Sequence, residues 1–262
     1  MTELADHAIA LEALRHGEIE VIGRLREASN QTFAVRILSS AGESVAVYKP
    51  IAGEAPLWDF PDGTLAARER AAYLVSEALG WDIVPPTILR DGPAGPGMLQ
   101  TWIESTDEDP VQVVRRGDEG ELLPVLDAED HRGQPVRVVH EDTIALRHIA
   151  VFDLVVNNTD RKGSHVLPVP GGHRFGIDHG VCFHVDDKVR TVLWGWAGST
   201  LSVEEIAALT HIQSDTELLE ALGDLLADDE VDAMMHRTAR LLRVGHLPIP
   251  RGEWPPIPWP PL

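Results

Sequence analysis

The order of the predicted helices and strands constrains the fold of this chain more than any other feature. Before residue 104, several segments are rich in Val, Ile, Phe and Thr, which is typical of strands. These predicted strands are 19–24, 32–39, 44–49, 84–89 and 97–103. Helical periodicity occurs at 4–17 and 64–79 and dominates after residue 140. The order predicts an α+β protein with two lobes, β-rich and then mainly helical, and a hinge near residues 100–104.

The helix at 64–79 is the clearest in the sequence, and Gly80 is a suitable residue to end it. Glu69 lies four residues after Leu65 and three before Ala72, so it borders the packed face of this helix. After residue 140 we expect a helix at 141–156, a hairpin of strands 166–169 and 174–177, and helices at 202–209, 215–226 and 229–242.

Two segments lack such patterns. Residues 104–140 are acidic and weakly patterned, and predict a surface excursion to which no helix or strand is assigned. Residues 247–262 contain seven prolines with Trp254 and Trp259, so this tail should be extended. The tail either binds a partner or packs along its own domain with the two tryptophans as anchors. The predicted domains are therefore 1–103, 104–246 and 247–262.

The charge balance excludes several classes of function. The sequence has 22 Lys+Arg against 42 Asp+Glu, a net charge of −20. Such a surface repels phosphate backbones and anionic lipids, so we expect no nucleic-acid partner and no broad membrane docking. No apolar run is long enough for a membrane span, and the scattered acidic residues of 1–24 lead us to expect no signal peptide there. With Cys182 as the single cysteine, no intramolecular disulfide can form, and a cytoplasmic protein is expected.

Residues 152–183 contain the most informative polar motif, and they read FDLVVNNTDRKGSHVLPVPGGHRFGIDHGVCF. A predicted helix ends in a polar loop that contains Asp160, a hairpin follows, and Asp178 comes directly after its second strand. Two carboxylates that leave adjacent backbone elements can converge on one cation. Phosphoryl transfer needs that arrangement, because one Asp positions or deprotonates the acceptor and another holds the metal that bridges the phosphates.

Asp160-Arg161 followed by Asp178-x-Gly180 resembles the catalytic and metal-binding loops of atypical kinases. The likeness is to the phosphatidylinositol 3-/4-kinase-related clan and HipA-like kinases, in particular to an actinobacterial family of that clan, and it covers most of residues 20–185. It implies a two-lobed protein-kinase-like fold that binds ATP with Mg²⁺ or Mn²⁺. It also implies phosphate transfer to an acceptor, with AMP transfer still open. The net charge of −20 favours a protein or small-molecule acceptor over a lipid.

The resemblance also implies roles for individual residues. Lys49 ends a Val-Ala-Val-Tyr-Lys strand and would orient the phosphates, while Glu69 would hold Lys49. Asp160 would position the acceptor, and Arg161 or Lys162 would offset charge on the transferred group. The residues implied to contact the nucleotide are Ser29, Asn30, Thr32, Lys49, Gln100, Trp102 and Ile103.

The implied metal site departs from the family pattern at one position. His165 stands where the family has an Asn that binds the second metal. Imidazole is a poorer ligand for magnesium than for softer metals. The predicted ligands are Asp178, His165 and Asn158. Two alternatives remain open: a pseudokinase that binds a nucleotide without turnover, and a metal-dependent phosphoesterase that uses Asp178, His165 and His179.

Overall fold

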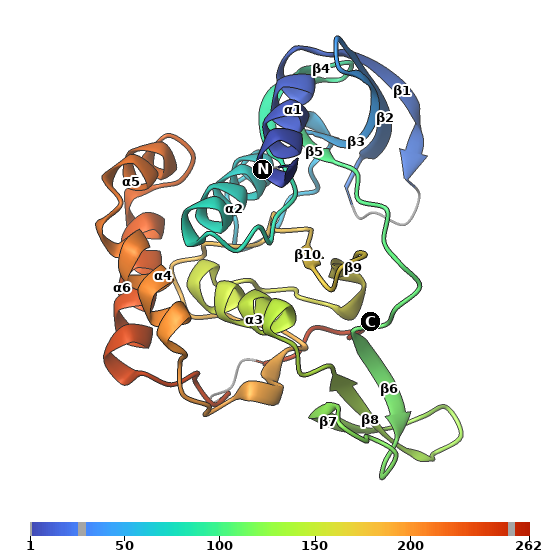
Figure 1. Cartoon of the computed structure of the whole chain (residues 1–262), viewed down its shortest axis with the longest axis vertical. Helices are drawn as coiled ribbons and strands as arrows, with labels where there is room; N and C mark the ends of the chain where they lie inside the picture. The colour runs from blue at the N-terminus through green and yellow to red at the C-terminus, as the bar shows by residue number, and fades with distance from the viewer. Residues whose placement is uncertain (1, 26–29, 251–254) are drawn as a thin grey trace.

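A five-stranded antiparallel sheet forms most of the N-terminal part of the chain. The computed structural model describes residues 2–25, 30–250 and 255–262 (Figure 1). The strand order in this sheet is β1-β2-β3-β5-β4. The strands are β1 (Glu18–Leu25), β2 (Thr32–Ser39), β3 (Gly42–Pro50), β4 (Thr87–Gly92) and β5 (Gly95–Thr101). Strands thus dominate this part and helices dominate later, which confirms the predicted α+β class.

The helix α1 (Thr2–His16) packs on one face of this sheet. Its Ala13 and Leu14 share a small hydrophobic core with apolar side chains from the strands: Val35, Ile37, Ala46, Tyr48, Ile88 and Leu99. Successive side chains of a strand point to opposite faces. Because Tyr48 is buried in this core, its neighbour Lys49 is directed to the other face of the sheet.

The helix α2 (Leu65–Leu79) connects the sheet with the rest of the molecule. It contacts β4 and β5 of the sheet, and it also contacts two helices of the C-terminal part, α4 (Val203–Ser214) and α5 (Thr216–Gly223). The carboxylate of Glu54 accepts from the backbone amides of Leu65 and Ala66 at 3.1 and 2.9 Å, which caps the helix and complements its dipole. Gly80 ends it with a left-handed φ of 70°. Glu69 therefore sits on a helix fixed at both ends.

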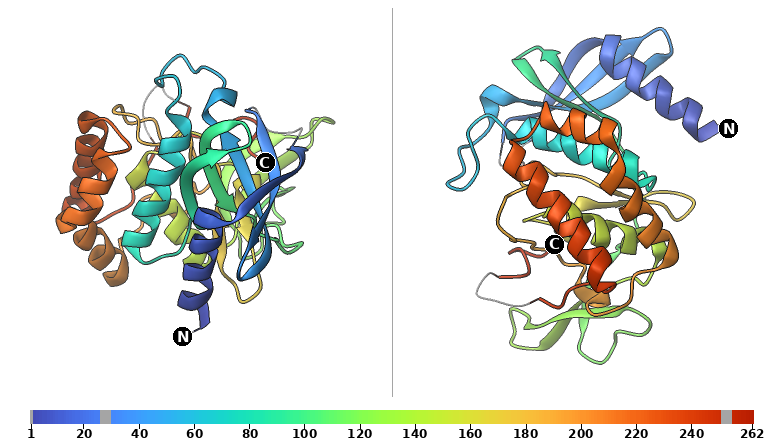
Figure 2. Two further views of the ribbon diagram at one scale, coloured as in Figure 1. Left: turned by 90° about the horizontal axis from the view of Figure 1, so that it is seen from above. Right: turned by 90° about the vertical axis from the view of Figure 1, so that its left-hand side faces the viewer.

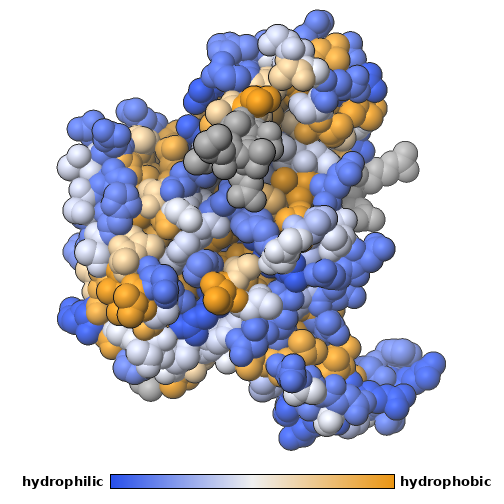
Figure 3. Space-filling view, viewed as in Figure 1, coloured by the Kyte–Doolittle hydropathy of each residue, from blue (hydrophilic) through white to orange (hydrophobic). Residues whose placement is uncertain are grey.

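Residues 111–140 form a second antiparallel sheet that the sequence did not predict. Its order is β6-β8-β7, with β6 (Val111–Arg115), β7 (Leu123–Glu129) and β8 (Pro135–His140), and it projects from the molecule (Figure 1). The expectation of a segment without strands is wrong here because Val111 and Val138 are buried in the main core and anchor the sheet. Charged residues stand between the valines and hide the apolar pattern from which a strand is predicted. The outer end of this sheet is mostly hydrophilic (Figure 3).

The C-terminal part is built around α3 (Ile144–Val156). A short hairpin follows it, β9 (Val166–Pro168) with β10 (Arg174–Gly176). The helices α4 (Val203–Ser214), α5 (Thr216–Gly223) and α6 (Asp228–Val244) lie together on one side of the molecule (Figure 2). Short 3₁₀ turns occur at η1 (Ile51–Gly53), η2 (Gly163–His165) and η3 (Trp194–Trp196). The buried residues of α2, α3 and α4–α6 form the main hydrophobic core.

The described part of the tail, residues 255–262, packs back on its own domain. The carbonyl of Pro256 accepts from the amide of Thr191 at 2.9 Å and from the Trp194 indole at 2.8 Å. The carbonyl of Pro261 accepts from the amide of Gly163 at 2.9 Å. Trp259 is 76% exposed, so its predicted role as an anchor is wrong, and Trp254 lies outside the described residues. Hydrogen bonds to its carbonyls and the packing of Ile257 against the main core hold the tail instead.

Among the helices that the structure describes, none combines the length and the apolar character that a bilayer span requires.

Candidate functional site

Lys49 lies where β3 approaches α2 and the loop after β10. Its Nζ is 2.7 Å from Glu69 Oε1 and 2.8 Å from Asp178 Oδ1. Burial alone would lower the pKa of Lys49, but the carboxylates of Asp178 and Glu69 outweigh it and raise that pKa above its ordinary value. Lys49 is therefore a firmly charged ammonium that joins three distant segments of the chain.

Glu69 uses both of its carboxylate oxygens. While Oε1 accepts from Lys49, Oε2 accepts from the backbone amide of His179 at 2.9 Å. The side chain is almost fully buried, so these bonds replace the water that the charge has lost. Glu69 thus positions the lysine and, at the same time, the backbone directly after Asp178.

Asp178 is the more open of the two carboxylates, with 50% of its side chain exposed. Its φ of 64° is left-handed, a conformation that non-glycine residues adopt rarely and that Asp and Asn adopt more readily than most. The Lys49 ammonium holds the pKa of Asp178 well below its usual range, and His165 adds to this effect. Asp178 is therefore ionised at neutral pH and presents oxygen atoms that a hard cation prefers.

Asp160 lies on the loop that follows α3, and Lys162 Nζ is 3.0 Å from its Oδ2. About a third of the Asp160 side chain is exposed. The Oδ1 of Asn158 accepts from the amide of Asp160 at 3.0 Å, and its Nδ2 donates to Asp153 at 3.0 Å. Asn158 is fully buried and bonded at both ends of its amide. The structure therefore places this predicted metal ligand inside the loop, where it shapes the backbone at Asp160.

A buried ion pair that the sequence reasoning missed holds this loop. Arg161 and Asp153 are both fully buried and 2.9 Å apart. Arg161 also donates to the carbonyls of His165 and Ile177 and to His179 Nε2. With all of these partners, Arg161 cannot offset charge on a transferred group, and of the two predicted candidates only Lys162 stays near the surface. The signal was present as one charged residue, Asp153, in an otherwise apolar helix end.

Two histidines border the carboxylates. His165 Nε2 lies 3.5 Å from Asp178 Oδ2, and burial lowers its pKa. His179 is fully buried against Arg161; burial, followed by the charge of Arg161, lowers its pKa well below the ordinary value. His179 Nε2 accepts from Arg161 at 2.6 Å, so this nitrogen is engaged inside the protein. The structure brings His165 to Asp178 but turns His179 toward the interior.

The residues predicted to contact a nucleotide are placed unevenly. Asn30 Oδ1 accepts from the amide of Ala55 at 2.7 Å, and buried Gln100 donates to Thr87 at 2.9 Å, so protein contacts occupy both. Thr32 is buried at the start of β2. Trp102 is 40% exposed after β5, and Ile103 is partly buried beside it. Ser29 lies outside the described residues.

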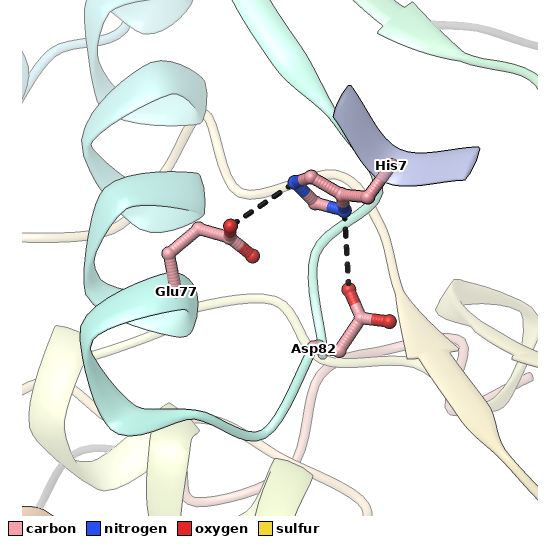
Figure 4. Close-up of side chains that lie close together, drawn as sticks. All are labelled: His7, Glu77 and Asp82. Atoms are coloured by element: carbon pink, nitrogen blue, oxygen red, sulfur yellow. Dashed lines mark ion pairs between the residues drawn. The ribbon is translucent and has the colours of Figure 1, made fainter. Parts of the chain in front are cut away.

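A different group of ligand-type side chains lies between α1 and α2 (Figure 4). Among the described residues, the ligand atoms of His7, Glu77 and Asp82 lie within 4.8 Å of one another. His7 Nε2 is 3.0 Å from Glu77 and 2.8 Å from the Tyr73 hydroxyl. These contacts account for the cluster as a polar link between the two helices. It shares no residue with the Lys49 and Asp178 site.

Comparison with known proteins places the chain in a family. The sequence is 46% identical over 269 residues to protein Rv2133c of Mycobacterium tuberculosis (strain ATCC 25618 / H37Rv), and the alignment covers 97% of this chain and 95% of Rv2133c. The chain belongs to the Rv2133c family. No family model matches the sequence.

Proposed function

We propose that this member of the Rv2133c family binds ATP with a divalent metal and transfers a phosphoryl group, in a two-lobed fold of the atypical kinase type. One observation carries the proposal: the ammonium of Lys49, on a sheet strand, contacts both Glu69 on a helix and Asp178 on a loop, at 2.7 and 2.8 Å. A strand lysine that bonds to both a helix glutamate and a loop aspartate is the arrangement that phosphoryl transfer uses to hold phosphates and metal.

The charge balance of the site supports this reading. Lys49 is firmly charged and bonds to two carboxylates, Glu69 and Asp178, of which Asp178 has a half-exposed side chain. Asp178 would hold the divalent metal, whose charge would offset that of the phosphates. Lys49 would then keep its bond to Glu69 and turn its remaining donors toward the phosphates. The oxygen-rich Asp178 suits Mg²⁺ or Mn²⁺, and His165 at 3.5 Å from it favours manganese.

Asp160 is the proposed acceptor-side carboxylate. It would accept the proton of an acceptor hydroxyl as that oxygen attacks the γ-phosphorus and ADP leaves. Lys162, 3.0 Å from Asp160, would offset charge on the transferred group. The net charge of −20 favours a protein or small soluble acceptor over an inositol lipid on an anionic membrane.

The decisive experiment is transfer from ATP labelled separately at the α- and γ-phosphates, with magnesium or manganese and a cell lysate as the source of acceptor. The variants Asp160→Asn and Asp178→Asn should each lose transfer at least about 100-fold, because each removes a charge that the reaction needs. The matched control is Asp118→Asn, which makes the same change at an exposed position between β6 and β7. This variant should behave as the parent protein.

Each outcome separates the alternatives. Label from the γ-phosphate alone, lost in both site variants, supports a kinase, whereas label from the α-phosphate means AMP transfer. Thermal stabilisation by ATP without labelling would assign a pseudokinase. If ATP neither binds nor labels anything, the proposal is wrong, and phosphate release from simple esters would then favour the phosphoesterase.

A further inference from the structure

A cavity of about 270 Å³ lies at the C-terminal end of α6, remote in sequence from Lys49 and Glu69. Its walls come from α3, from the segment around η3, from α6 and from the start of the tail. Most of the lining side chains are apolar, and they include Leu154, Val189, Trp194, Leu241, Val244 and Ile249. Apolar walls with a few polar groups at fixed positions are typical of sites that hold small organic molecules.

The polar group that distinguishes this cavity is Arg237. It lines the cavity and is only 4% exposed. Its Nε and Nη1 donate to the backbone carbonyls of Val155 and His184 at 3.3 and 3.1 Å. Among the described residues, nothing accepts from its buried Nη2. No carboxylate bonds to this guanidinium within the described chain, so a buried positive charge is left with a spare donor, which is costly without an anionic partner.

The surroundings of Arg237 are also locally positive. Arg240 lines the same cavity, and among the residues that the structure describes Asp187 is the one acidic side chain in the lining. Asp187 Oδ2 is already 2.7 Å from Arg240 Nη1, so its charge is directed to Arg240. Burial lowers the pKa of Arg237 to about 10, so the group remains a cation at neutral pH. In a chain of net charge −20, such a positive, apolar-walled cavity stands out.

We propose that this cavity binds a small organic anion with an apolar body, a carboxylate or a phosphate monoester. The anionic head would accept from Nη2 of Arg237 after the guanidinium turns toward the cavity, because this atom is screened from solvent in the structure. The apolar body would lie against Leu241, Val189 and Leu154. Arginine offers a planar fork that suits carboxylate and phosphate oxygens equally. Because Arg237 also holds the carbonyls of Val155 and His184, the ligand would stabilise the junction between α3 and the segment that follows Asp178.

The test uses the full chain without ATP, so that it is independent of the proposed phosphotransfer. Sodium octanoate and octyl phosphate are titrated by calorimetry, with octan-1-ol as the uncharged probe of the same length. Saturable binding of at least one anion, ten-fold or more tighter than octan-1-ol, supports the proposal, and the tighter anion identifies the head group. Equal binding of the alcohol, or no saturable binding of either anion, overturns it.

Variants then locate the site. Arg237→Gln should weaken binding of the preferred anion at least ten-fold. Because a buried change can disturb folding, Val244→Trp is the second variant. Val244 is the last residue of α6, lines the cavity and is 54% exposed. A bulky ring at this exposed position should fill the cavity without disturbing the core. Val203→Trp, at the exposed first residue of α4, is the matched control and should bind like the parent. Unchanged binding in Val244→Trp would show that the anion binds elsewhere.

Discussion

Two buried carboxylates, Glu69 and Asp153, organise the candidate site from opposite sides. Glu69 bonds to Lys49 and to the amide of His179, so it fixes the groups that would face phosphate and metal. Asp153 bonds to Arg161, Asn158 and Thr191, so it fixes the loop that carries Asp160. Both act by replacing lost hydration with several hydrogen bonds, which is the condition under which a protein tolerates a buried charge.

Sequence reasoning found one of these carboxylates and missed the other. Glu69 could be proposed because it follows a strand lysine at the spacing of a known motif, and the structure brings Lys49 and Glu69 within 2.7 Å. Asp153 belongs to no motif, and its partner Arg161 is eight residues away on a turn that only the folded chain defines. Asn158 was predicted as a metal ligand from proximity in sequence, which cannot tell whether a side chain points inward.

Asp153→Asn should reduce the free energy of unfolding by about 3 to 5 kcal/mol, because it leaves the fully buried Arg161 without its counter-charge. Urea unfolding monitored by circular dichroism measures the change. The matched control is Glu12→Gln, which removes the partner of Arg15 in an exposed pair and should have little effect. Similar losses in the two variants would mean that the buried pair has no special role.

At the scale of elements, the sequence predicted most of the helices and strands but not their arrangement. The bounds of β2 and the C-terminal end of α2 agree with the prediction, because apolar periodicity and Gly80 define them locally. The sheet of β6, β7 and β8 was missed, since its stability comes from residues such as Val138 that pack against a distant core. Strand propensity depends on such context more strongly than helix propensity does.

The docking of this sheet depends on close contact at η3. A Cβ on Gly195 would lie 2.6 Å from the Leu123 Cβ of β7 and would collide with the ring of His140, the last residue of β8. Gly195→Ala should therefore cost about 1 to 3 kcal/mol of stability, because the crowded groups must shift. Gly223→Ala, at the end of α5 with open space around it, should be neutral or slightly stabilising. Differential scanning calorimetry of the two variants compares them, and equal melting temperatures would contradict the proposed contact.

For the whole molecule, we expect buried histidines to make the folded state less stable in acid. The acidic surface carries most of the net charge of −20, whereas several histidines are buried. Burial lowers the pKa of His140 and of His165, and burial together with the Arg161 charge lowers that of His179. These groups stay neutral in the folded protein at pH values where the unfolded chain takes up protons.

The free energy of unfolding should consequently fall as the pH is lowered from about 7.5 to about 5.5, because the unfolded state then binds more protons than the folded state. Urea titrations at the two pH values measure the loss. His179→Leu should show a smaller loss than the parent, since one buried imidazole is removed. His236→Gln, an exposed change on α6, should leave the loss unchanged. A loss that is identical in His179→Leu and in the parent would rule out this histidine as a source.

The bond between Lys49 and its two carboxylates has a practical consequence for chemical labelling. The whole sequence contains three lysines, Lys49, Lys162 and Lys188, and the first two lie in the candidate site. A lysine held as an ion pair is a poor nucleophile, because acylation requires the neutral amine. The extent of Lys49 acylation, measured by mass spectrometry, therefore reports whether its ion pairs are intact, with few other lysines to complicate the spectrum. A bound molecule that frees or shields Lys49 changes the acylation of one peptide in a digest.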